Sequence, residues 1–288
     1  MNSKRQIGLH LRLNNTFSEI VQEAKDYGIK TFQCFLTKQD NGKYPKITHE
    51  DEEKFLKLRN KKSTNIYAHT SYWINLASGN KISSKASEDL LKKEIRVAKK
   101  LNIQYLVLHP GSATRFKSSD KDPLNKIAGI KSIAKILNRV LSKEDQIQIL
   151  LENTAHGNKT IGSDITDFLL LKELLNEPEK TKFCIDFAHA FAHGYDLKKT
   201  DKFIDFLDQN MGLENIKLIH LNDSAEEKGS KIDKHEIPGK GLIGSKCLKK
   251  LINHPKLKKI PIILELPNGL NKQENTEILK EINTWQIQ

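Results

Sequence analysis

The chain contains 288 residues, of which 37% are hydrophobic and 29% are charged, and this balance argues against a disordered or fibrous protein. The 48 Lys and Arg outnumber the 36 Asp and Glu, and the formal net charge of +12 fits either a polyanionic partner such as nucleic acid or a lysine-rich proteome. There is no apolar run of the roughly 18 residues that a membrane span needs, no apolar signal-peptide core, and no cysteine spacing typical of a disulfide framework.

Eight short apolar runs recur along the chain, each followed by an amphipathic or polar stretch. The runs are nearly continuous in apolar residues rather than alternating, which is typical of parallel strands buried on both faces. They span residues 6–11, 30–36, 65–70, 104–110, 147–153, 182–189, 216–223 and 260–267.

The stretches between the runs carry helix signals. Thr16 and Glu19 have the spacing of a capping box, and Gly28 is placed to end that helix. Ser87 and Thr200 are each placed to begin a later helix. Eight strand–helix units predict a (β/α)8 TIM barrel, an α/β fold in a single domain over residues 1–288. An open doubly wound sheet is the alternative, although no G-x-G-x-x-G motif follows the first run.

Six of the predicted strands end on an ionisable side chain of a type that binds metals. Because the carboxyl ends of all barrel strands open onto one face, we expect these side chains to converge there. His10 also lies on a strand and is a candidate for supporting them. The six residues are His69, His109, Glu152, Asp186, His220 and Glu265.

Three further candidates lie close to these strand ends in the sequence. His189 follows Asp186 by three positions, and Asp233 and His235 form a D-K-H motif after the seventh strand. Imidazoles and carboxylates without a thiol suit zinc or manganese. Nine ligands are too many for one ion, and closely spaced ions suit in-line displacement at a phosphoester. The residues alone therefore predict multi-metal hydrolysis.

Several longer segments resemble the endonuclease IV family, the zinc-dependent apurinic/apyrimidinic endonucleases, in the same order along nearly the whole chain. The pattern HLND, then D-x-H, then G-x-G-x-I-G is specific, whereas HPGS alone is not. The segments are HTSYWINL (69–76), HPGS (109–112), LENTAHG (151–157), DFAHAFAHGYD (186–196), HLNDSAEEKGSKIDKHEIPGKGLIG (220–244) and ILELP (263–267).

The resemblance implies a (β/α)8 barrel that holds three zinc ions per chain, with manganese possible at one site. By position, Glu152 would bridge the first two ions. The three ligand sets would be His69, His109 and Glu152; then Glu152, Asp186, His220 and Glu265; and finally His189, Asp233 and His235.

The resemblance also implies the reaction. The family hydrolyses the phosphodiester 5′ to an abasic site in double-stranded DNA, leaving a 3′-hydroxyl and a 5′-deoxyribose phosphate, and it trims blocked 3′ ends. Glu152 is the first candidate for orienting or deprotonating the attacking water, and Glu265 is the second. We expect a monomer in the cytoplasm, associated with the nucleoid, if the source is bacterial, and otherwise in another intracellular compartment that contains DNA.

Loop residues are expected to contact the DNA. Tyr72 matches the family tyrosine that fills the gap in the duplex, where an aromatic ring stacks on bases. Residues 36–44 lack the arginine often found in this loop of the family, so a lysine is expected to replace it. The remaining candidates for phosphate contacts are Gly111, Ser112, Lys38 or Lys43, Lys231 and Lys234.

Two alternative functions fit parts of this pattern. A sugar isomerase or epimerase on a related barrel also binds metal at strand ends, but it uses one or two ions and does not need His189, Asp233 and His235. A non-catalytic binder of DNA lesions would be expected to have lost at least one ligand, and none is missing from the sequence.

Overall fold

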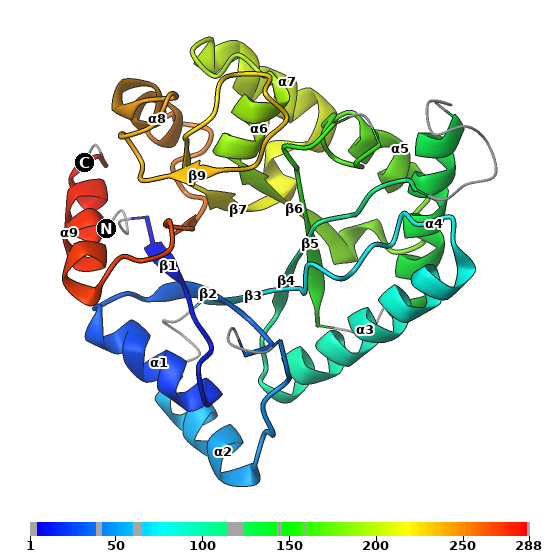
Figure 1. Ribbon diagram of the computed structural model, residues 1–288, viewed down its shortest axis with the longest axis horizontal. Coiled ribbons are helices and arrows are strands. Elements are labelled where there is room, and N and C mark those ends of the chain that lie inside the picture. The colour runs from blue at the N-terminus through cyan, green and yellow to red at the C-terminus, as the bar shows by residue number, and fades with distance from the viewer. Residues whose placement is uncertain are drawn as a thin grey trace.

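The computed structural model describes residues 5–38, 42–59, 65–114, 124–142, 144, 146–157 and 159–286. Within them, eight parallel strands form a closed barrel in the order β1-β10-β7-β6-β5-β4-β3-β2 (Figure 1). The barrel closes where β1 pairs with β10, with Ile7 opposite Ile262 and Leu9 opposite Leu264. The strands are β1 (Ile7–Leu11), β2 (Thr31–Phe35), β3 (Asn65–His69), β4 (Tyr105–Leu108), β5 (Gln148–Glu152), β6 (Thr181–Asp186), β7 (Ile216–His220) and β10 (Ile262–Leu264). The predicted TIM barrel is confirmed.

Helices surround the ring of strands on its outer side (Figure 1). Two 3₁₀ turns precede β6 and β7, η1 (Pro178–Lys180) and η2 (Leu213–Asn215), and a small antiparallel pair, β8 (Asp223–Ser224) and β9 (His235–Glu236), follows β7. The helices are α1 (Phe17–Asp26), α2 (His49–Leu58), α3 (Lys81–Lys100), α4 (Leu124–Val140), α5 (Asp167–Glu173), α6 (Phe187–His193), α7 (Thr200–Met211), α8 (Ser245–Ile252) and α9 (Lys272–Thr284).

The predicted helix start at Ser87 is wrong, whereas the one at Thr16 is correct. The Thr16 side chain accepts a hydrogen bond from the Glu19 amide and begins α1. Helix α3 begins earlier than predicted, because Asn80 accepts a hydrogen bond from the Ser83 amide. The Ser87 hydroxyl lies inside α3 and accepts a hydrogen bond from the Asn75 amide instead.

The sixth apolar run spans residues 182–189, and its strand, β6, ends at Asp186, as predicted. Residues 187–189 already belong to α6. The Asp186 carboxylate accepts a hydrogen bond from the His189 amide at 2.7 Å, so this side chain caps the helix. The chain therefore turns into a helix at the barrel mouth.

The barrel interior explains why the apolar runs do not alternate. In six of the eight strands, β3 to β7 and β10, one side packs on the helices in the main core, and the other side packs inside the barrel. Both faces are therefore buried, as parallel barrel strands require. The inner layer consists of Tyr67, Val107, Leu150, Cys184, Leu218 and Ile263.

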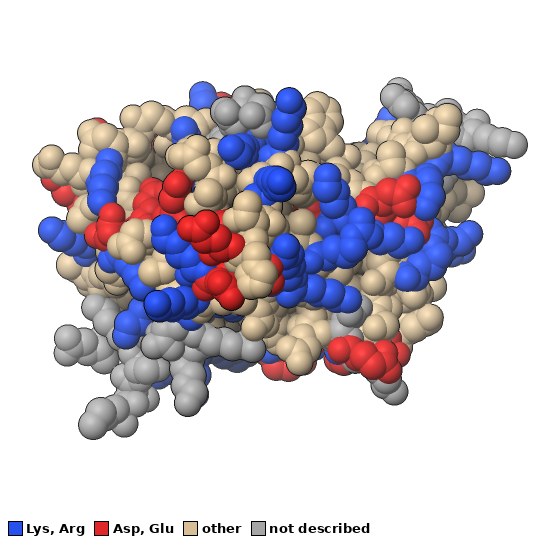
Figure 2. Space-filling model, turned by 90° about the horizontal axis from the view of Figure 1, so that it is seen from below, with Lys and Arg blue, Asp and Glu red and all other residues tan. Residues whose placement is uncertain are grey.

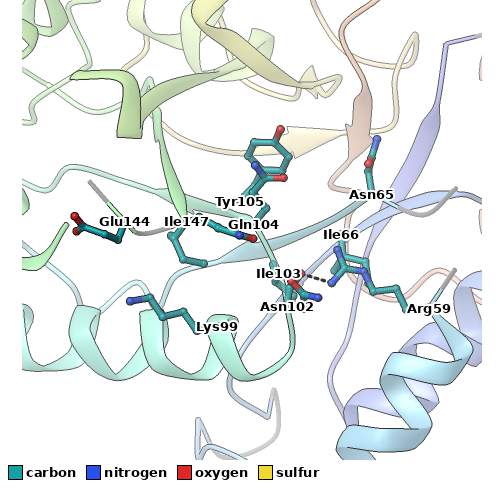
Figure 3. A pocket seen from close by; sticks show the side chains of 11 residues that line it. Arg59, Asn65, Ile66, Lys99, Asn102, Ile103, Gln104, Tyr105, Glu144 and Ile147 are labelled. Carbon is teal, nitrogen blue, oxygen red and sulfur yellow. Dashed lines mark hydrogen bonds between the residues drawn. The ribbon is translucent and has the colours of Figure 1, made fainter. Parts of the chain in front are cut away.

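A cavity of about 420 Å³ opens at the amino ends of the strands, among Asn65, Tyr105 and Ile147 (Figure 3). The Arg59 guanidinium lines it and donates to the carbonyls of Leu101 and Asn102, just after α3. In TIM barrels the amino ends of the strands serve stability, and the opposite face carries the chemistry.

The protein surface is basic, in keeping with the net charge of +12. Figure 2 shows one face on which Lys and Arg side chains are widely distributed, with smaller groups of Asp and Glu among them. None of the helices in the described ranges has the length and apolar character needed to cross a membrane.

Candidate metal centre

Each of the six predicted strand-end ligands lies two positions beyond a residue of the inner barrel layer. Val107 precedes His109 in this way, and Leu150 precedes Glu152. Successive side chains of a strand point to opposite faces, so a residue two positions farther along points to the same side. The barrel therefore directs all six polar side chains inward at its carboxyl end, directly beyond its apolar filling.

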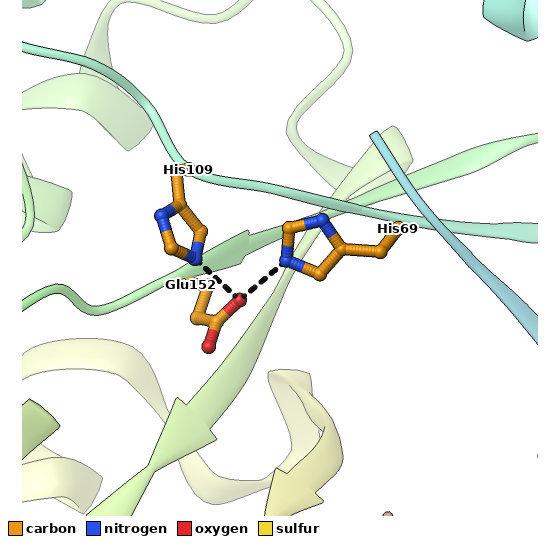
Figure 4. Close-up of side chains that lie close together, drawn as sticks. All are labelled: His69, His109 and Glu152. Atoms are coloured by element: carbon orange, nitrogen blue, oxygen red, sulfur yellow. Dashed lines mark hydrogen bonds and ion pairs between the residues drawn. The ribbon is translucent and has the colours of Figure 1, made fainter. Parts of the chain in front are cut away.

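His69, His109 and Glu152 form the first group of possible ligands (Figure 4). The Oε2 atom of Glu152 lies 3.2 Å from Nε2 of His69 and 3.0 Å from Nε2 of His109. Glu152 is completely buried, and the His69 side chain is only 2% exposed. His109 is the most accessible member, because 23% of its side chain is exposed.

The second group surrounds the other oxygen of the same carboxylate. Glu152, Asp186, His220 and Glu265 offer ligand atoms that all lie close together. Nδ1 of His220 is 2.8 Å from Oε1 of Glu152 and 3.3 Å from Oε2 of Glu265. It is also 3.8 Å from Oδ2 of Asp186. Glu152 thus faces both groups, one oxygen to each.

The third group is assembled by the start of α6 and by the small β8–β9 pair. His189 lies in the first turn of α6, and His235 is held by pairing with Ser224. Oδ1 of Asp233 lies 3.2 Å from Nε2 of His189 and 3.3 Å from Nε2 of His235, and the two nitrogens are 3.2 Å apart. Asp186 approaches this group as well, with Oδ2 3.6 Å from Nε2 of His235.

These separations fit a metal ion with short bonds to nitrogen and oxygen. A tetrahedral zinc with bonds of about 2.0–2.1 Å has ligand atoms roughly 3.3 Å apart. The three atoms of His189, Asp233 and His235 have almost this spacing. The donor set of imidazoles and carboxylates also suits zinc.

The buried histidines are oriented by hydrogen bonds at their second ring nitrogens. Nδ1 of His69 lies 2.8 Å from the Thr70 carbonyl oxygen, and Nδ1 of His189 lies 2.8 Å from the Asn153 carbonyl oxygen. An N–H at that nitrogen leaves the other one unprotonated and free to bind metal. Both histidines present Nε2 to a carboxylate of their group.

The charges of the cluster balance one another in the protein without metal. Burial raises the pKa of Glu152, but the positive charges of His220 and His109 outweigh it and hold that pKa well below its usual range. Burial lowers the pKa of His189, but the carboxylates of Asp186 and Asp233 raise it well above its usual value. These buried carboxylates thus need positive charge beside them, which either protonated histidines or metal ions supply.

Sequence reasoning missed the amide side chains that hold the ligands. Oε1 of Gln33 accepts from Nε2 of His220 at 3.0 Å, and Nε2 of Gln33 donates to Glu265 at 2.7 Å. Asn222 donates to Oδ2 of Asp186 at 2.6 Å and accepts from the Glu265 amide at 2.8 Å. A polar Gln33 inside an apolar strand was the one available signal. His10 supports Glu265 as suspected, at 3.0 Å from its Oε1.

Cys184 lies with Glu152 and His220 in the barrel interior. Burial raises the pKa of its thiol to about 12. Without a bound cation this shift favours the protonated thiol, which is a poor metal ligand. Cys184 was not among the ligands predicted from the sequence, and the structure adds it to the side chains that lie within reach of Glu152 and His220.

Tyr72 lies at the rim of the metal centre and is 68% exposed. Its ring centroid is 5.5 Å from that of His69 and 5.7 Å from that of His109. The next residue, Trp73, is 86% exposed, although no sequence pattern singled it out. One aromatic ring thus lies beside the ligands, and the residue next to it in the sequence exposes a second.

The other predicted DNA contacts differ in how free they are. The Lys231 ammonium donates a hydrogen bond to the His193 carbonyl. The Lys234 side chain is exposed, and its Nζ lies 3.6 Å from Oε1 of Glu226. Lys38 is half-buried, and its amide donates to the Lys43 carbonyl at 2.8 Å.

Gly111 and Ser112 contact residues of the two neighbouring loops, after β3 and after β5. The Ser112 amide donates to Oδ1 of Asn75 at 3.0 Å, and the Ser112 hydroxyl pairs with Thr160 at 2.8 Å. Gly111 has a φ of +100°, and a Cβ there would lie 2.2 Å from Oδ1 of Asn75. Glycine is required at this turn because no other residue fits.

Comparisons with known proteins agree with this architecture. The family model described as xylose isomerase-like TIM barrel matches residues 21–286. A probable endonuclease 4 from Thermosipho melanesiensis is 35% identical over 292 residues, which cover 98% of this chain and 99% of the relative. A probable endonuclease 4 from Thermoplasma volcanium is 33% identical over 282 residues, which cover 97% of this chain and 95% of the relative.

Solved structures show the same relationship. Endonuclease IV from Thermus thermophilus superimposes with a TM-score of 0.81 at 28% identity and covers 97% of this chain and 98% of its own. A D-tagatose 3-epimerase-like protein superimposes with a TM-score of 0.70 at 15% identity, and the match covers 97% of this chain and 96% of that protein. At this identity the match shows only a common fold. The chain therefore belongs to the endonuclease IV family of hydrolytic nucleases, within the xylose isomerase-like TIM barrels.

Proposed function

We propose that this protein is a DNA-repair endonuclease that hydrolyses the phosphodiester 5′ to an abasic site, leaving a 3′-hydroxyl and a 5′-deoxyribose phosphate. It would also trim blocked 3′ ends and would use three zinc ions. The relatives named endonuclease 4, at 30–36% identity, support this activity. All nine candidate ligands come from one chain, so a monomer would suffice, acting in an intracellular compartment that contains DNA.

One observation carries the proposal. Three groups of ligand atoms lie side by side at one barrel mouth, and Glu152 directs one oxygen to the first group and the other to the second. Adjacent cation sites that share a carboxylate suit in-line displacement at phosphorus. When bound, the ions would act as Lewis acids that lower the pKa of water and neutralise charge on the phosphate oxygens.

The side chains of the centre have separable tasks in this proposal. Glu152 and Glu265 would orient the attacking water or accept its proton. Both carboxylates place an oxygen near Nδ1 of His220, in the second ligand group, and Glu152 also faces the first group. His189, Asp233 and His235 would hold positive charge where the leaving oxygen departs. No serine or cysteine nucleophile is needed, since water supplies the attacking oxygen.

DNA contacts in this proposal come from the rim. Tyr72 would stack in the gap that the abasic nucleotide leaves in the duplex, since aromatic rings bind unstacked bases well. Lys38 and Lys234 would contact phosphates. Ser112 and Lys231 would shape the surface, because they already donate hydrogen bonds within the protein, and Gly111 would hold the turn that brings this loop against Asn75.

The sugar isomerase alternative is less well supported. It leaves the close grouping of His189, Asp233 and His235 without a task, and this grouping has the spacing of a separate ion site. The epimerase-like structures match at low identity and therefore share the fold alone.

The test uses the full chain loaded with zinc. Its metal content is measured by mass spectrometry, and it is incubated with an end-labelled duplex that carries one abasic site and with an intact duplex of the same sequence. We expect three zinc ions per chain, one cut on the 5′ side of the lesion, and a product end that a polymerase extends. The intact duplex should stay whole.

Matched carboxylate variants separate chemistry from folding. Glu152→Gln should keep the fold and lose at least about 100-fold in cleavage rate, an effect in the range of general base catalysis. Glu144→Gln, beside the cavity at the opposite end of the barrel, should cleave normally. Failure of the zinc-loaded protein to cut the abasic duplex would refute the proposal. Salt-dependent binding without cutting would indicate a lesion-binding protein, and one exchangeable manganese would indicate an isomerase.

A further inference from the structure

A buried carboxylate on α3 contacts both loops that border the Tyr72 side of the metal centre. Glu94 is only 1% exposed, although an unpaired carboxylate is costly to bury. It is not one of the candidate metal ligands, and it lies on a helix rather than at a strand end. A buried acidic group outside the metal centre needs its own explanation.

The first contact of Glu94 is with the loop after β3. The backbone amide of Ser71 donates to Oε1 at 3.1 Å and to Oε2 at 3.3 Å. Ser71 directly precedes Tyr72, and its carbonyl and hydroxyl accept from the amides of Ile74 and Trp73. Glu94 therefore anchors the turn that presents the two exposed aromatic rings.

The second contact is with the loop after β2. The Tyr44 hydroxyl donates to Oε1 of Glu94 at 2.9 Å. Nζ of Lys93, the neighbouring residue on α3, lies 3.8 Å above the Tyr44 ring. Tyr44 follows Lys43, whose carbonyl accepts from the Lys38 amide. The helix thus holds this loop by the hydroxyl and by the ring face of one side chain.

We propose that Glu94 is a positioning residue that ties these two loops together, so that Tyr72 and Lys38 are presented to DNA in a fixed relative position. The role in DNA binding rests on the function proposed above, whereas the tie between the loops does not. Ordered loops lose less conformational entropy on binding, so such a tie acts on affinity for the duplex. It does not touch the ligand atoms, and zinc content should not depend on it.

The experiment compares Glu94→Ala with Glu94→Gln in the zinc-loaded full chain. Glutamine can still accept from the Ser71 amide through its oxygen and donate to the Tyr44 hydroxyl through its nitrogen. We expect Glu94→Ala to raise KM for the abasic duplex about ten-fold, equivalent to roughly 1.4 kcal/mol, with kcat within about two-fold and three zinc ions retained. Glu94→Gln should restore KM to near the original value.

Hydrogen exchange provides a readout that is independent of cleavage. Peptides that contain Ser71–Trp73 should exchange faster in Glu94→Ala than in the original protein or in Glu94→Gln. If zinc-loaded protein does not cut abasic DNA, the proposed function fails, while the exchange rates still decide whether the tie exists. Unchanged exchange and unchanged KM in Glu94→Ala would overturn the inference.

A second pair of variants applies if Glu94→Ala does not fold. Tyr44→Phe removes only the hydroxyl that donates to Glu94, and we expect KM to rise about three-fold, as for the loss of one hydrogen bond. Tyr27→Phe is the matched control, because its ring lies under Lys272 at 5.7 Å and its hydroxyl is hydrogen-bonded to Asn275. Equal effects of the two variants would contradict the proposed positioning.

Discussion

Gln33 controls which nitrogen of His220 faces the metal centre, and Gln33→Met tests that role. The side chain is completely buried at the barrel mouth. Its oxygen accepts from Nε2 of His220 at 3.0 Å, which directs Nδ1 toward Glu152. Its nitrogen donates to Glu265 at 2.7 Å. Methionine has a similar length and flexibility but makes neither hydrogen bond.

The expected magnitude follows from these two contacts. Loss of a partner that orients a metal ligand costs about 10- to 100-fold in metal affinity, which corresponds to roughly 1.4–2.7 kcal/mol. Here both affected ligands, His220 and Glu265, belong to the second group. An unsatisfied N–H on buried His220 would also lower the free energy of unfolding by about 1–3 kcal/mol.

Zinc affinity is measured by competition with a chromogenic chelator, and unfolding is measured in urea. At a limiting free-zinc concentration, we expect Gln33→Met to bind one zinc ion fewer than the original protein, for which three ions are proposed. Gln148→Met is the control, since Gln148 is at the opposite end of the barrel and donates to the Glu179 carbonyl at 3.4 Å. Unchanged zinc affinity in Gln33→Met would refute the reasoning and leave Gln33 a packing residue.

Three further predictions concern single side chains. Asp223→Asn should lower the free energy of unfolding in urea by about 3 kcal/mol, because the buried carboxylate accepts from the amides of Gly239 and Ile243, both at 2.9 Å; a loss below about 1 kcal/mol would contradict this. Burial raises the pKa of Glu94 to about 7, so the folded protein holds this proton more tightly than the unfolded chain, and stability falls as pH rises from about 4.5 through 7. Between pH 5 and 8, Glu94→Gln should therefore gain roughly 2–3 kcal/mol relative to the original protein, and parallel urea-unfolding profiles would show the reasoning wrong. Tyr72→Ala should leave stability within about 0.5 kcal/mol but raise KM for the abasic duplex at least ten-fold through the loss of about 1–3 kcal/mol of stacking, whereas an unchanged KM would rule out the stacking role.

The strand ends were predictable because their signal is local. An apolar run that ends on His69 or Glu152 indicates a buried strand. Because side chains alternate along a strand, it also indicates that the final polar side chain points inward. The barrel itself followed from the eight-fold repetition of such runs. The error at Ser87 also comes from a local signal, because Ser87 and Asn80 are both residue types that cap helices. Asn80 caps α3, whereas the Ser87 hydroxyl accepts from the Asn75 amide, and this contact appears only in the tertiary structure.

The sequence by itself determined the barrel, the inward direction of the six strand-end ligands and, through resemblance, the family. Only the tertiary structure decided which atoms meet. Gln33 and His220 are 187 positions apart, yet their hydrogen bond selects the nitrogen that faces Glu152. Glu94 likewise joins loops that no local pattern connects. Local patterns determine which way a side chain points, whereas contacts between distant segments depend on how the strands and helices pack.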